Sequence, residues 1–170
     1  MKIRVLNESD APLYQEVRLN ALKINPEAFG STYEREAEFS LESVAERLEP
    51  TKDKFILDAF NHNGLVVGIV TFMRENGLKT CHKGNVFGVY VAPDGRGKGL
   101  GKSLMIELIR KAKNCEGLEQ INLTVVSANS SAKKLYKSLG FEVYGLERNA
   151  LKFKGQYFDE DLMVLDLTSN

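Results

Sequence analysis

The chain has 170 residues, of which 43% are hydrophobic and 27% are charged. These fractions are ordinary for a globular protein, and the length is enough to bury one substantial core, so we expect residues 1–170 to form a single domain. Lysine and arginine together number 23, and aspartate and glutamate together also number 23. The zero net charge argues against a broad nucleic-acid-binding surface.

Cysteine content and hydropathy indicate a soluble protein of the cytoplasm. Cys81 and Cys115 are the only cysteines. Neither lies in a metal-ligand spacing or a disulfide framework, so we expect no metal site and a reducing, cytoplasmic location. Residues 1–7 are too short and too mixed in character for a signal peptide. No apolar run approaches the roughly 20 residues that a membrane helix needs, so we expect no membrane partner.

The first half of the sequence predicts one strand, two helices and then three strands. A short strand covers Ile3–Leu6, and Ser9 or Asp10 can cap the helix that follows. Residues 27–39 are rich in hydroxyl and carboxyl groups and predict a loop, and a second short helix covers residues 41–48. Strands are predicted over 54–60, 65–74 and 85–91, with a hairpin turn at 61–64.

The second half alternates helices and strands. A helix follows the third of these strands, with a buried face at Leu104, Met105, Leu108, Ile109 and Ala112. A strand over 120–126, a helix over about 129–139 and closing strands over 141–145 and 162–167 complete the order βααβββαβαββ. Hairpins join the three central strands, and a helix separates the third from the next. We therefore expect a mixed sheet with one parallel pair and with helices on its faces.

A glycine-rich segment lies between the strand at 85–91 and the following helix. Gly95, Gly97, Gly99 and Gly101 alternate here with Arg96, Lys98 and Leu100. Glycine lets the backbone approach a ligand closely, and the free N–H groups at a helix N-terminus bind anions. With the charge of Arg96, Lys98 and Lys102, the segment predicts a pyrophosphate site. Taken alone, it fits a plain connecting turn equally well.

The spacing of these glycines excludes two common nucleotide-binding loops. A P-loop requires a glycine five positions before Gly101, where this chain has Arg96. The dinucleotide fingerprint requires a third glycine where this chain has Leu100 or Lys102. The spacing that does fit is Arg-x-x-Gly-x-Gly, at Arg96, Gly99 and Gly101.

A second motif lies downstream, on the helix predicted over about 129–139. Asn129, Ala132, Leu135, Tyr136, Gly140 and Phe141 follow the pattern Asn-x-x-Ala-x-x-Leu-Tyr-x-x-x-Gly-Phe. The two motifs and the order of elements resemble the GCN5-related N-acetyltransferase (GNAT) family. The resemblance covers residues 1–170 in architecture and residues 86–141 in diagnostic motifs. It implies an α/β fold in which helices flank a mixed, mostly antiparallel sheet.

The resemblance implies that acetyl-CoA is the co-substrate and that the glycine loop binds its pyrophosphate. The implied coenzyme-binding residues are Val89, Tyr90, Val91, Arg96, Gly97, Lys98, Gly99, Leu100, Gly101, Lys102, Asn129, Lys134 and Tyr136. The backbone of Val89 and Val91 is implied to pair with the pantetheine arm, as an added strand would. The family's matching tyrosine often protonates the departing thiolate, so Tyr136 is the expected general acid, although periodicity alone would make it a core residue. Asn129 also fits a helix N-cap.

The general base is left open by the sequence. Some members of the family carry Glu or His on the strand before the loop, but residues 85–91 contain neither. Glu34 and Glu36 lie in the early loop that usually helps to form the acceptor site, and plain solvent exposure would explain them as well. Glu34 is therefore a candidate base or acceptor-site residue, beside His82 and a water relay.

We expect an enzyme that transfers the acetyl group of acetyl-CoA to a primary amine of a small molecule or peptide by direct attack. The alternative is an acyl-CoA-binding sensor with the same fold and no turnover. A P-loop nucleotide hydrolase is a more remote alternative, because the glycine spacing fails. The sequence identifies neither the acceptor amine nor the oligomeric state, although homodimers are common in the family.

Overall fold

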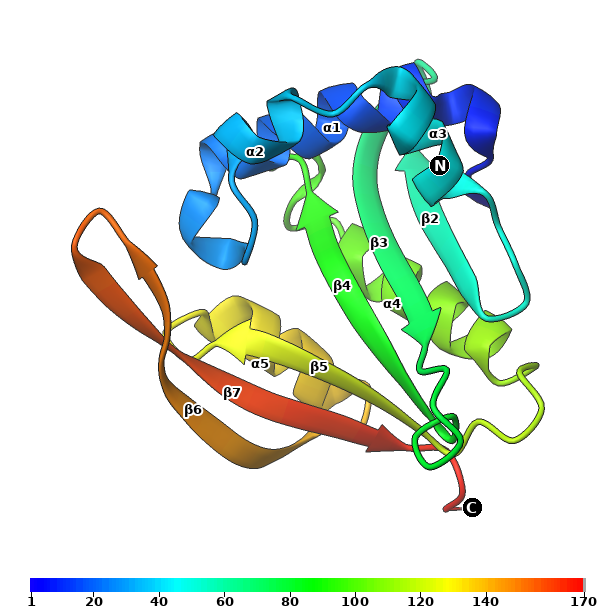
Figure 1. The fold of residues 1–170 in the computed structure, drawn as a ribbon, viewed down its shortest axis with the longest axis vertical. Coiled ribbons are helices and arrows are strands. Elements are labelled where there is room, and N and C mark those ends of the chain that lie inside the picture. Colours follow the sequence, from blue (N-terminus) through cyan, green and yellow to red (C-terminus); the bar gives the residue numbers. More distant parts are fainter. Residues whose placement is uncertain (170) are drawn as a thin grey trace.

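Seven strands form one sheet in the computed structural model, which describes residues 1–169 (Figure 1). The strands are β1 (Lys2–Val5), β2 (Lys54–Phe60), β3 (Val66–Arg74), β4 (Lys83–Val91), β5 (Gln120–Val126), β6 (Glu142–Phe153) and β7 (Gln156–Asp166). The helices are α1 (Ala11–Ile24), α2 (Tyr33–Ala37), α3 (Leu41–Leu48), α4 (Leu100–Ala112) and α5 (Ser130–Ser138), with 3-10 turns η1 (Glu8–Asp10), η2 (Pro26–Ala28) and η3 (Pro93–Gly95). None of the helices within residues 1–169 is long and apolar enough to cross a membrane.

The sheet is mixed, which confirms the predicted fold class. Its spatial order is β1-β2-β3-β4-β5-β7-β6. Every neighbouring pair is antiparallel except β4 and β5, which run parallel. The parallel pair requires a crossover, and α4 supplies it by returning the chain from the end of β4 to the start of β5.

Two hydrophobic clusters lie on opposite faces of the central strands. Phe55 and Leu57 of β2 belong to the cluster that contains α4, and Ile56 belongs to the cluster that contains α1 and α3. Successive side chains of a strand point to opposite faces, so β2 is buried on both. Figure 1 shows α4 passing behind β3 and β4. Its residues Leu104, Met105, Leu108 and Ala112 are buried as predicted, whereas Ile109 is half-buried at the edge of the cluster.

β4 and β5 separate toward their C-terminal ends. They pair only where Lys83–Asn85 lies beside Gln120–Asn122, and Figure 1 shows the two strands diverging beyond this point. The pairing of β4 with β3 shifts register between Ile69 and Thr71, and Gly88 in this stretch has a φ of +59°. A bulge bends the strand that carries it. As a result, the second half of β4 has one edge that no strand of the described sheet covers.

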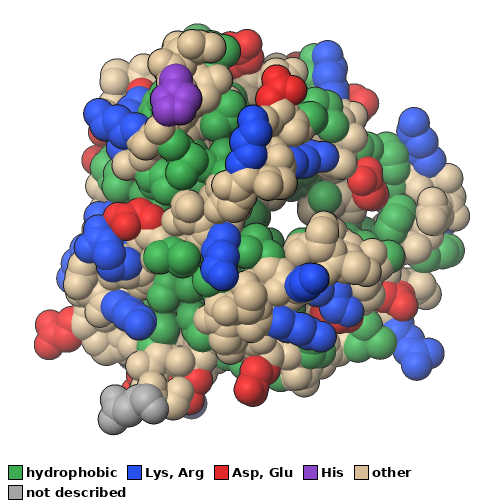
Figure 2. Space-filling model, turned by 180° about the vertical axis from the view of Figure 1, so that it is seen from behind, with side chains coloured by type: hydrophobic (Ala, Val, Ile, Leu, Met, Phe, Trp, Pro, Cys, Tyr) green, Lys and Arg blue, Asp and Glu red, His purple; other side chains and the backbone are tan. Residues whose placement is uncertain are grey.

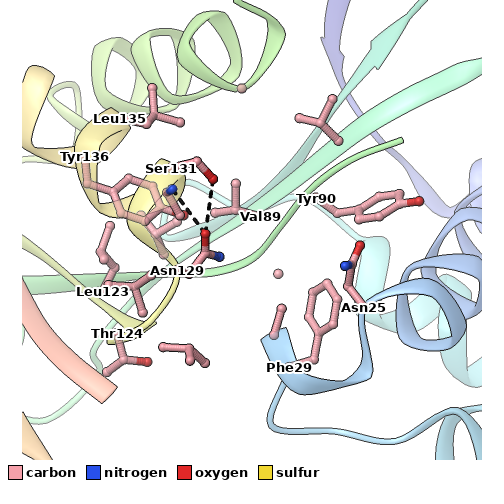
Figure 3. Close-up of a pocket in the computed structure, with 18 of the residues that line it drawn as sticks. Asn25, Phe29, Val89, Tyr90, Leu123, Thr124, Asn129, Ser131, Leu135 and Tyr136 are labelled. Carbon is pink, nitrogen blue, oxygen red and sulfur yellow. Dashed lines mark hydrogen bonds between the residues drawn. The ribbon is translucent and has the colours of Figure 1, made fainter. Parts of the chain in front are cut away.

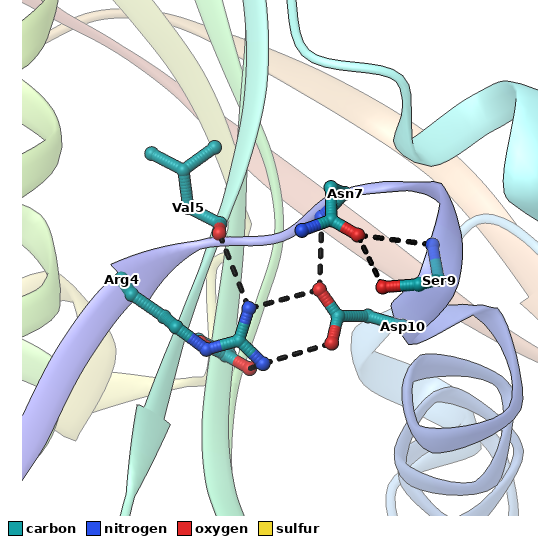
Figure 4. Close-up of polar contacts among 6 residues, drawn as sticks. Arg4, Val5, Asn7, Ser9 and Asp10 are labelled. Atoms are coloured by element: carbon teal, nitrogen blue, oxygen red, sulfur yellow. Dashed lines mark hydrogen bonds and ion pairs between the residues drawn. The ribbon is translucent and has the colours of Figure 1, made fainter.

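Asp10, one of the two predicted caps, is the N-cap residue of α1, but its side chain makes no capping hydrogen bond to that helix. The side-chain cap forms earlier, at η1, where Asn7 Oδ1 accepts a hydrogen bond from the Ser9 backbone N–H at 3.0 Å. The Asp10 carboxylate instead accepts from the Asn7 N–H at 2.9 Å and from the Arg4 guanidinium at 2.8 and 2.9 Å (Figure 4). The turn η1 therefore moves the start of the helical segment upstream of α1.

The loop expected over residues 27–39 contains helical turns. These are the end of η2 and the five-residue helix α2. The Thr32 hydroxyl caps α2 by accepting a hydrogen bond from the Arg35 N–H at 3.2 Å. Glu36 on α2 is only 1% exposed. The polar composition that predicted a solvated loop therefore includes a buried charged group.

The two closing strands are longer than predicted. Instead of covering 141–145 and 162–167, they form a long hairpin, β6–β7, which turns at Lys154 and Gly155. Most side chains of β6 are exposed. Because these exposed residues lack a regular apolar alternation, the pattern by which strands are recognised is absent from this part of the sequence.

Candidate active site

The divergence of β4 and β5 leaves a cavity of about 1380 Å³ in the sheet. Its walls come from β4, β5, the glycine loop, the start of α4, α5, β7 and the segment that follows α1. Figure 2 shows the molecule hollowed at this position, with Lys and Arg side chains around the opening. In Figure 3, Tyr136 lies on one side of the cavity and Phe29 on the other, with Val89 between them. The volume exceeds the roughly 300–1,000 Å³ of ordinary small-ligand sites, so the cavity suits a long ligand or two ligands together.

The second half of β4 forms one wall through Val89, Tyr90 and Val91. The side chains of Val89 and Val91 pack against the larger core cluster, and Tyr90 is 5% exposed in the smaller one. On its other edge, β4 pairs with Gly68 and Ile69 of β3. The edge that faces the cavity therefore offers backbone N–H and C=O groups with which an extended, amide-containing ligand can pair.

The glycine loop delivers the chain to the N-terminus of α4. Gly97 and Gly99 both have a φ of +74°, in the left-handed region that favours glycine, and Gly99 is the N-cap of α4. The Ser103 N–H bonds back to the Gly99 carbonyl at 3.0 Å. This is the first hydrogen bond of the helix, so the backbone N–H groups of residues 100–102 have no partner within α4, as at every helix start. They form an anion-binding position on the wall of the cavity.

The lysines expected at the coenzyme are placed differently from one another. Lys102 and Lys134 have exposed side chains and line the cavity. Lys98 is also exposed but is not among the lining residues, because its Nζ donates to the Asp94 carbonyl at 2.9 Å and lies along η3. The expectation that Lys98 contacts the ligand therefore finds no support in its side-chain position.

Arg96 lines the cavity, yet its guanidinium is occupied by the protein. Its Nε donates to the Val91 carbonyl at 2.9 Å, and its Nη2 donates to Asn25 Oδ1 at 2.7 Å. These hydrogen bonds tie the glycine loop to the end of β4 and to the end of α1. The arginine of the first motif thus holds the loop in position as well as adding positive charge to it.

The second motif forms the start of α5. Asn129 Oδ1 accepts from the Ala132 N–H at 3.3 Å and from the Ser131 hydroxyl at 3.2 Å (Figure 3), so Asn129 caps the helix as the sequence predicts. Tyr136 is 6% exposed and packs edge-on against Phe141, with 6.0 Å between ring centroids. Burial raises the pKa of Tyr136 to about 12. The phenol therefore keeps its proton at neutral pH while it lines the cavity.

None of the side chains considered as general bases lines this cavity. Glu34 is exposed and borders a neighbouring hollow of about 360 Å³ beside the β6–β7 turn. Glu36 is buried and accepts hydrogen bonds from Arg18 and Arg47. Burial alone would raise the pKa of Glu36, but these two arginines outweigh it and hold the pKa below its usual range. His82 precedes β4, at the end of the strand away from the cavity.

A carboxylate that the sequence did not single out does line the cavity. Glu160 of β7 is half-buried and stands between Val126 of β5 and Glu147 of β6 in the strand register. Burial raises the pKa of Glu160; a hydrogen bond with Thr124 opposes this shift and the charge of Glu147 adds to it. Glu160 lies in residues 146–161, for which the sequence predicted no helix or strand. It reaches the cavity because β7 pairs with β5, and this pairing leaves no local pattern in the sequence.

Neither cysteine belongs to the cavity. Cys81 and Cys115 are half-buried, unpaired thiols, and neither is a lining residue. Among residues 1–169, no group of three or more His, Cys, Asp or Glu side chains is placed to hold a metal ion.

Comparison with known proteins identifies the family. A family model described as the acetyltransferase (GNAT) domain matches residues 3–162. This chain belongs to the GNAT family. Both motifs that resemble the family in the sequence lie within the matched residues, and both contribute to the walls of the cavity.

Individual relatives agree with this assignment. The L-amino acid N-acetyltransferase AaaT of Escherichia coli is 32% identical over 102 residues, which are 60% of this chain and 62% of that protein. The match thus covers less than two thirds of the relative's length. A GNAT-family acetyltransferase of Streptococcus pneumoniae superposes with a TM-score of 0.88 at 24% identity, over 98% of this chain and 99% of that chain. A GNAT phosphinothricin acetyltransferase of Sinorhizobium meliloti, solved in complex with acetyl-CoA, gives 0.81 at 23% identity, over 98% and 88%. At these identities the two structures establish a shared GNAT fold.

Proposed function

We propose that residues 1–170 form a single N-acetyltransferase domain that transfers the acetyl group of acetyl-CoA to a primary amine. Family membership supports this reaction class. The observation that carries the proposal is the single cavity, which joins the anion position of α4 to the phenol of Tyr136 along the open edge of β4. A phenol and the Glu160 carboxylate in that same cavity favour turnover over a sensor that only binds acyl-CoA.

Acetyl-CoA is expected to lie along the open edge of β4, with its pyrophosphate at the N-terminus of α4. The free N–H groups and the positive end of the helix dipole attract the pyrophosphate, and Lys102 and Lys134 add charge beside it. The pantetheine amides pair with the backbone of residues 89–91. The Sinorhizobium meliloti structure, which has the same fold, was solved in complex with acetyl-CoA, and this supports the choice of ligand.

Tyr136 is proposed to act as the general acid. The neutral amine attacks the thioester carbonyl, backbone N–H groups of β4 hold the oxyanion, and the carbon–sulfur bond breaks. The Tyr136 hydroxyl donates to the sulfur as negative charge develops on it. A pKa of about 12 makes this phenol a weaker acid than a thiol with a pKa of roughly 8.5. We therefore expect donation to accompany thiolate departure, with the resulting phenolate then regaining a proton from solvent.

Glu160 is proposed to receive the proton that the amine loses on acetylation. Burial already raises the pKa of this carboxyl, and a base is more effective as its pKa approaches the operating pH. Glu160 takes this role in place of Glu34, which borders the neighbouring hollow. Glu34 is retained as a residue of the acceptor entrance, because the two hollows share Glu27, Phe29, Gly30, Ser31 and Phe158.

The acceptor is proposed to be a small molecule rather than a protein. The name of the Escherichia coli relative, an L-amino acid N-acetyltransferase, supports this choice. The two unpaired thiols fit a reducing cytoplasm, which remains our expected location. A homodimer remains an expectation that comes from the family.

Two measurements on the full chain test the proposal. Acetyl-CoA binding is measured by calorimetry, and thiol release from acetyl-CoA is measured across a panel of primary amines and peptides. Binding together with turnover of at least one amine supports the transferase. Binding without turnover of any acceptor would identify a sensor instead, and absence of binding would remove the proposal altogether.

A further inference from the structure

Arg18 is a positive group in the cavity that the proposed transfer does not use. It lies on α1, its side chain is 13% exposed, and it lines the same cavity as Tyr136 and Glu160. Its guanidinium carbon lies 5.1 Å from the centroid of the Phe29 ring, another part of the wall. A guanidinium carries five N–H donors, and leaving donors unsatisfied away from water is costly. The hydrogen-bond partners of Arg18 therefore show which of its donors are left for a ligand.

Glu36 occupies one edge of the Arg18 guanidinium. Nε donates to Oε1 at 3.1 Å and Nη2 donates to Oε2 at 2.9 Å, a two-bond geometry that fixes the orientation of the group. Arg47 of α3 donates to the same carboxylate at 3.3 Å. Two arginines thus share one buried carboxylate, so the cluster keeps one unit of positive charge in excess.

The remaining edge of Arg18 faces the bulged part of β4. Its Nη1 lies 3.2 Å from the position that a Cβ would take at Gly88. Within residues 1–169 the hydrogen bonds of Arg18 go from Nε and Nη2 and none comes from Nη1. Because Gly88 has no side chain, this donor can lie close to the backbone of β4 in the wall of the cavity.

We propose that Arg18 Nη1 binds a carboxylate on the acceptor, so that the acceptor is a small aminocarboxylate such as an α-amino acid. This inference rests on the proposed acetyl transfer and names its substrate class. A guanidinium is rigid and always charged, and its planar fork matches a carboxylate. The opposite charge of Glu160 lies on the wall of the same cavity. In the proposed pose a zwitterion places its carboxylate at Arg18 and directs its amine toward the Glu160 side of the cavity, with Glu36 acting as a positioning residue.

The test compares L-amino acids with their carboxamides as acceptors. A carboxamide keeps the amine and the side chain but lacks the negative charge. Its amine also has the lower pKa and the larger neutral fraction, so a preference for the free acid cannot come from nucleophilicity. We expect the wild-type protein to favour the free acid by roughly 10-fold or more in kcat/KM, the scale of one hydrogen bond between charged groups.

Variants assign that preference to Arg18. Arg18→Gln should lower kcat/KM for the acids by roughly 10- to 100-fold, mainly through KM, and leave the carboxamides unchanged. Arg47→Gln is the matched control, because Arg47 shares the Glu36 carboxylate but does not line the cavity. It removes the excess charge of the cluster but leaves Arg18 Nη1 in the cavity, so it should lower the ratio of acid to amide clearly less than Arg18→Gln does. This ratio does not depend on the folded fraction of a preparation, and thermal unfolding is recorded in parallel.

Several outcomes would overturn the inference. The first is a wild-type protein whose kcat/KM is no higher for acids than for carboxamides. The second is an Arg18→Gln variant whose kcat/KM falls equally for both substrate types. The third is an Arg47→Gln variant whose ratio of acid to amide falls as far as that of Arg18→Gln. If Arg18→Gln does not fold, the wild-type ratio decides. Turnover of amides without any preference for acids would refute the aminocarboxylate and leave acetyl transfer intact. Absence of turnover with every acceptor would refute the transfer itself.

Discussion

Replacement of Asp58 by asparagine should stabilise the protein at neutral and alkaline pH. Asp58 lies on β2, its side chain is fully buried, and neither carboxylate oxygen has a hydrogen-bond partner among residues 1–169. The nearest cation, Arg4, is 3.9 Å away and is already engaged by Asp10 (Figure 4). Burial chiefly, with the charge of Asp10 added and that of Arg4 opposing, raises the pKa of Asp58 to about 7.

The raised pKa fixes the sign and size of the effect. The folded carboxyl holds its proton up to about pH 7, whereas the unfolded one releases it near pH 3.9, so folding stability falls as the pH rises between these values. A difference of about three pKa units corresponds to roughly 4 kcal/mol. Asparagine resembles the protonated form at every pH. We therefore expect the variant to exceed the wild type by about 4 kcal/mol at pH 8 and by less than about 1 kcal/mol near pH 4.

Urea unfolding of both proteins between pH 4 and pH 8 measures this difference. Titrating groups distant from Asp58 contribute equally to both proteins, so the difference between them reports on Asp58 together with its neighbours Arg4 and Asp10. Asp94→Asn, at an exposed position in the turn η3, is the control and should follow the wild type. A gap between Asp58→Asn and wild type that does not change with pH would refute the reasoning. So would a variant less stable than wild type at pH 8.

Three further predictions concern the site. Tyr136→Phe should lower kcat by roughly 10²- to 10⁴-fold with little change in acetyl-CoA affinity. Tyr14→Phe, similarly buried outside the cavity, should keep kcat, and equal losses would exclude a specific acid role for Tyr136. Because the pKa of Glu160 is raised, kcat/KM should fall at low pH with an apparent pKa above the ordinary range of a glutamate. Glu160→Gln should remove this fall. A pH profile that the substitution does not change would assign the base elsewhere. Gly99→Ala and Gly155→Ala each place a side chain at a positive φ, +74° and +78°, at a cost of about 1–2 kcal/mol in unfolding free energy; calorimetry should show weaker acetyl-CoA binding for Gly99→Ala alone, and comparable binding by both would argue against the loop as the pyrophosphate site.

Local signals in the sequence account for the elements that were predicted well. The β2–β3 hairpin has its turn residues at 61–64, and β5 coincides with the segment 120–126, in which apolar and polar residues alternate up to Val125. The strands β6 and β7 extend far beyond their predicted bounds, since most side chains of β6 are exposed and carry no regular apolar alternation. The N-cap position of α1 falls at Asp10 as predicted, but the Asp10 carboxylate accepts from Arg4 and from the Asn7 N–H, and the side-chain cap forms at Asn7 instead.

The family, the mixed sheet and the two motifs can all be recognised from the order of the residues, since a strand, a glycine loop and a helix start must follow one another along the chain to form an anion site. Which side chains meet in the cavity depends on tertiary contacts. The tertiary structure directed Lys98 along η3, placed Glu34 at the neighbouring hollow, and brought Glu160 and Arg18 to the cavity walls. Their places depend on the divergence of β4 from β5, on the position of β7 beside β5, and on the ion pair with Glu36. These are contacts between residues far apart in the chain, for which a single sequence carries no local signal.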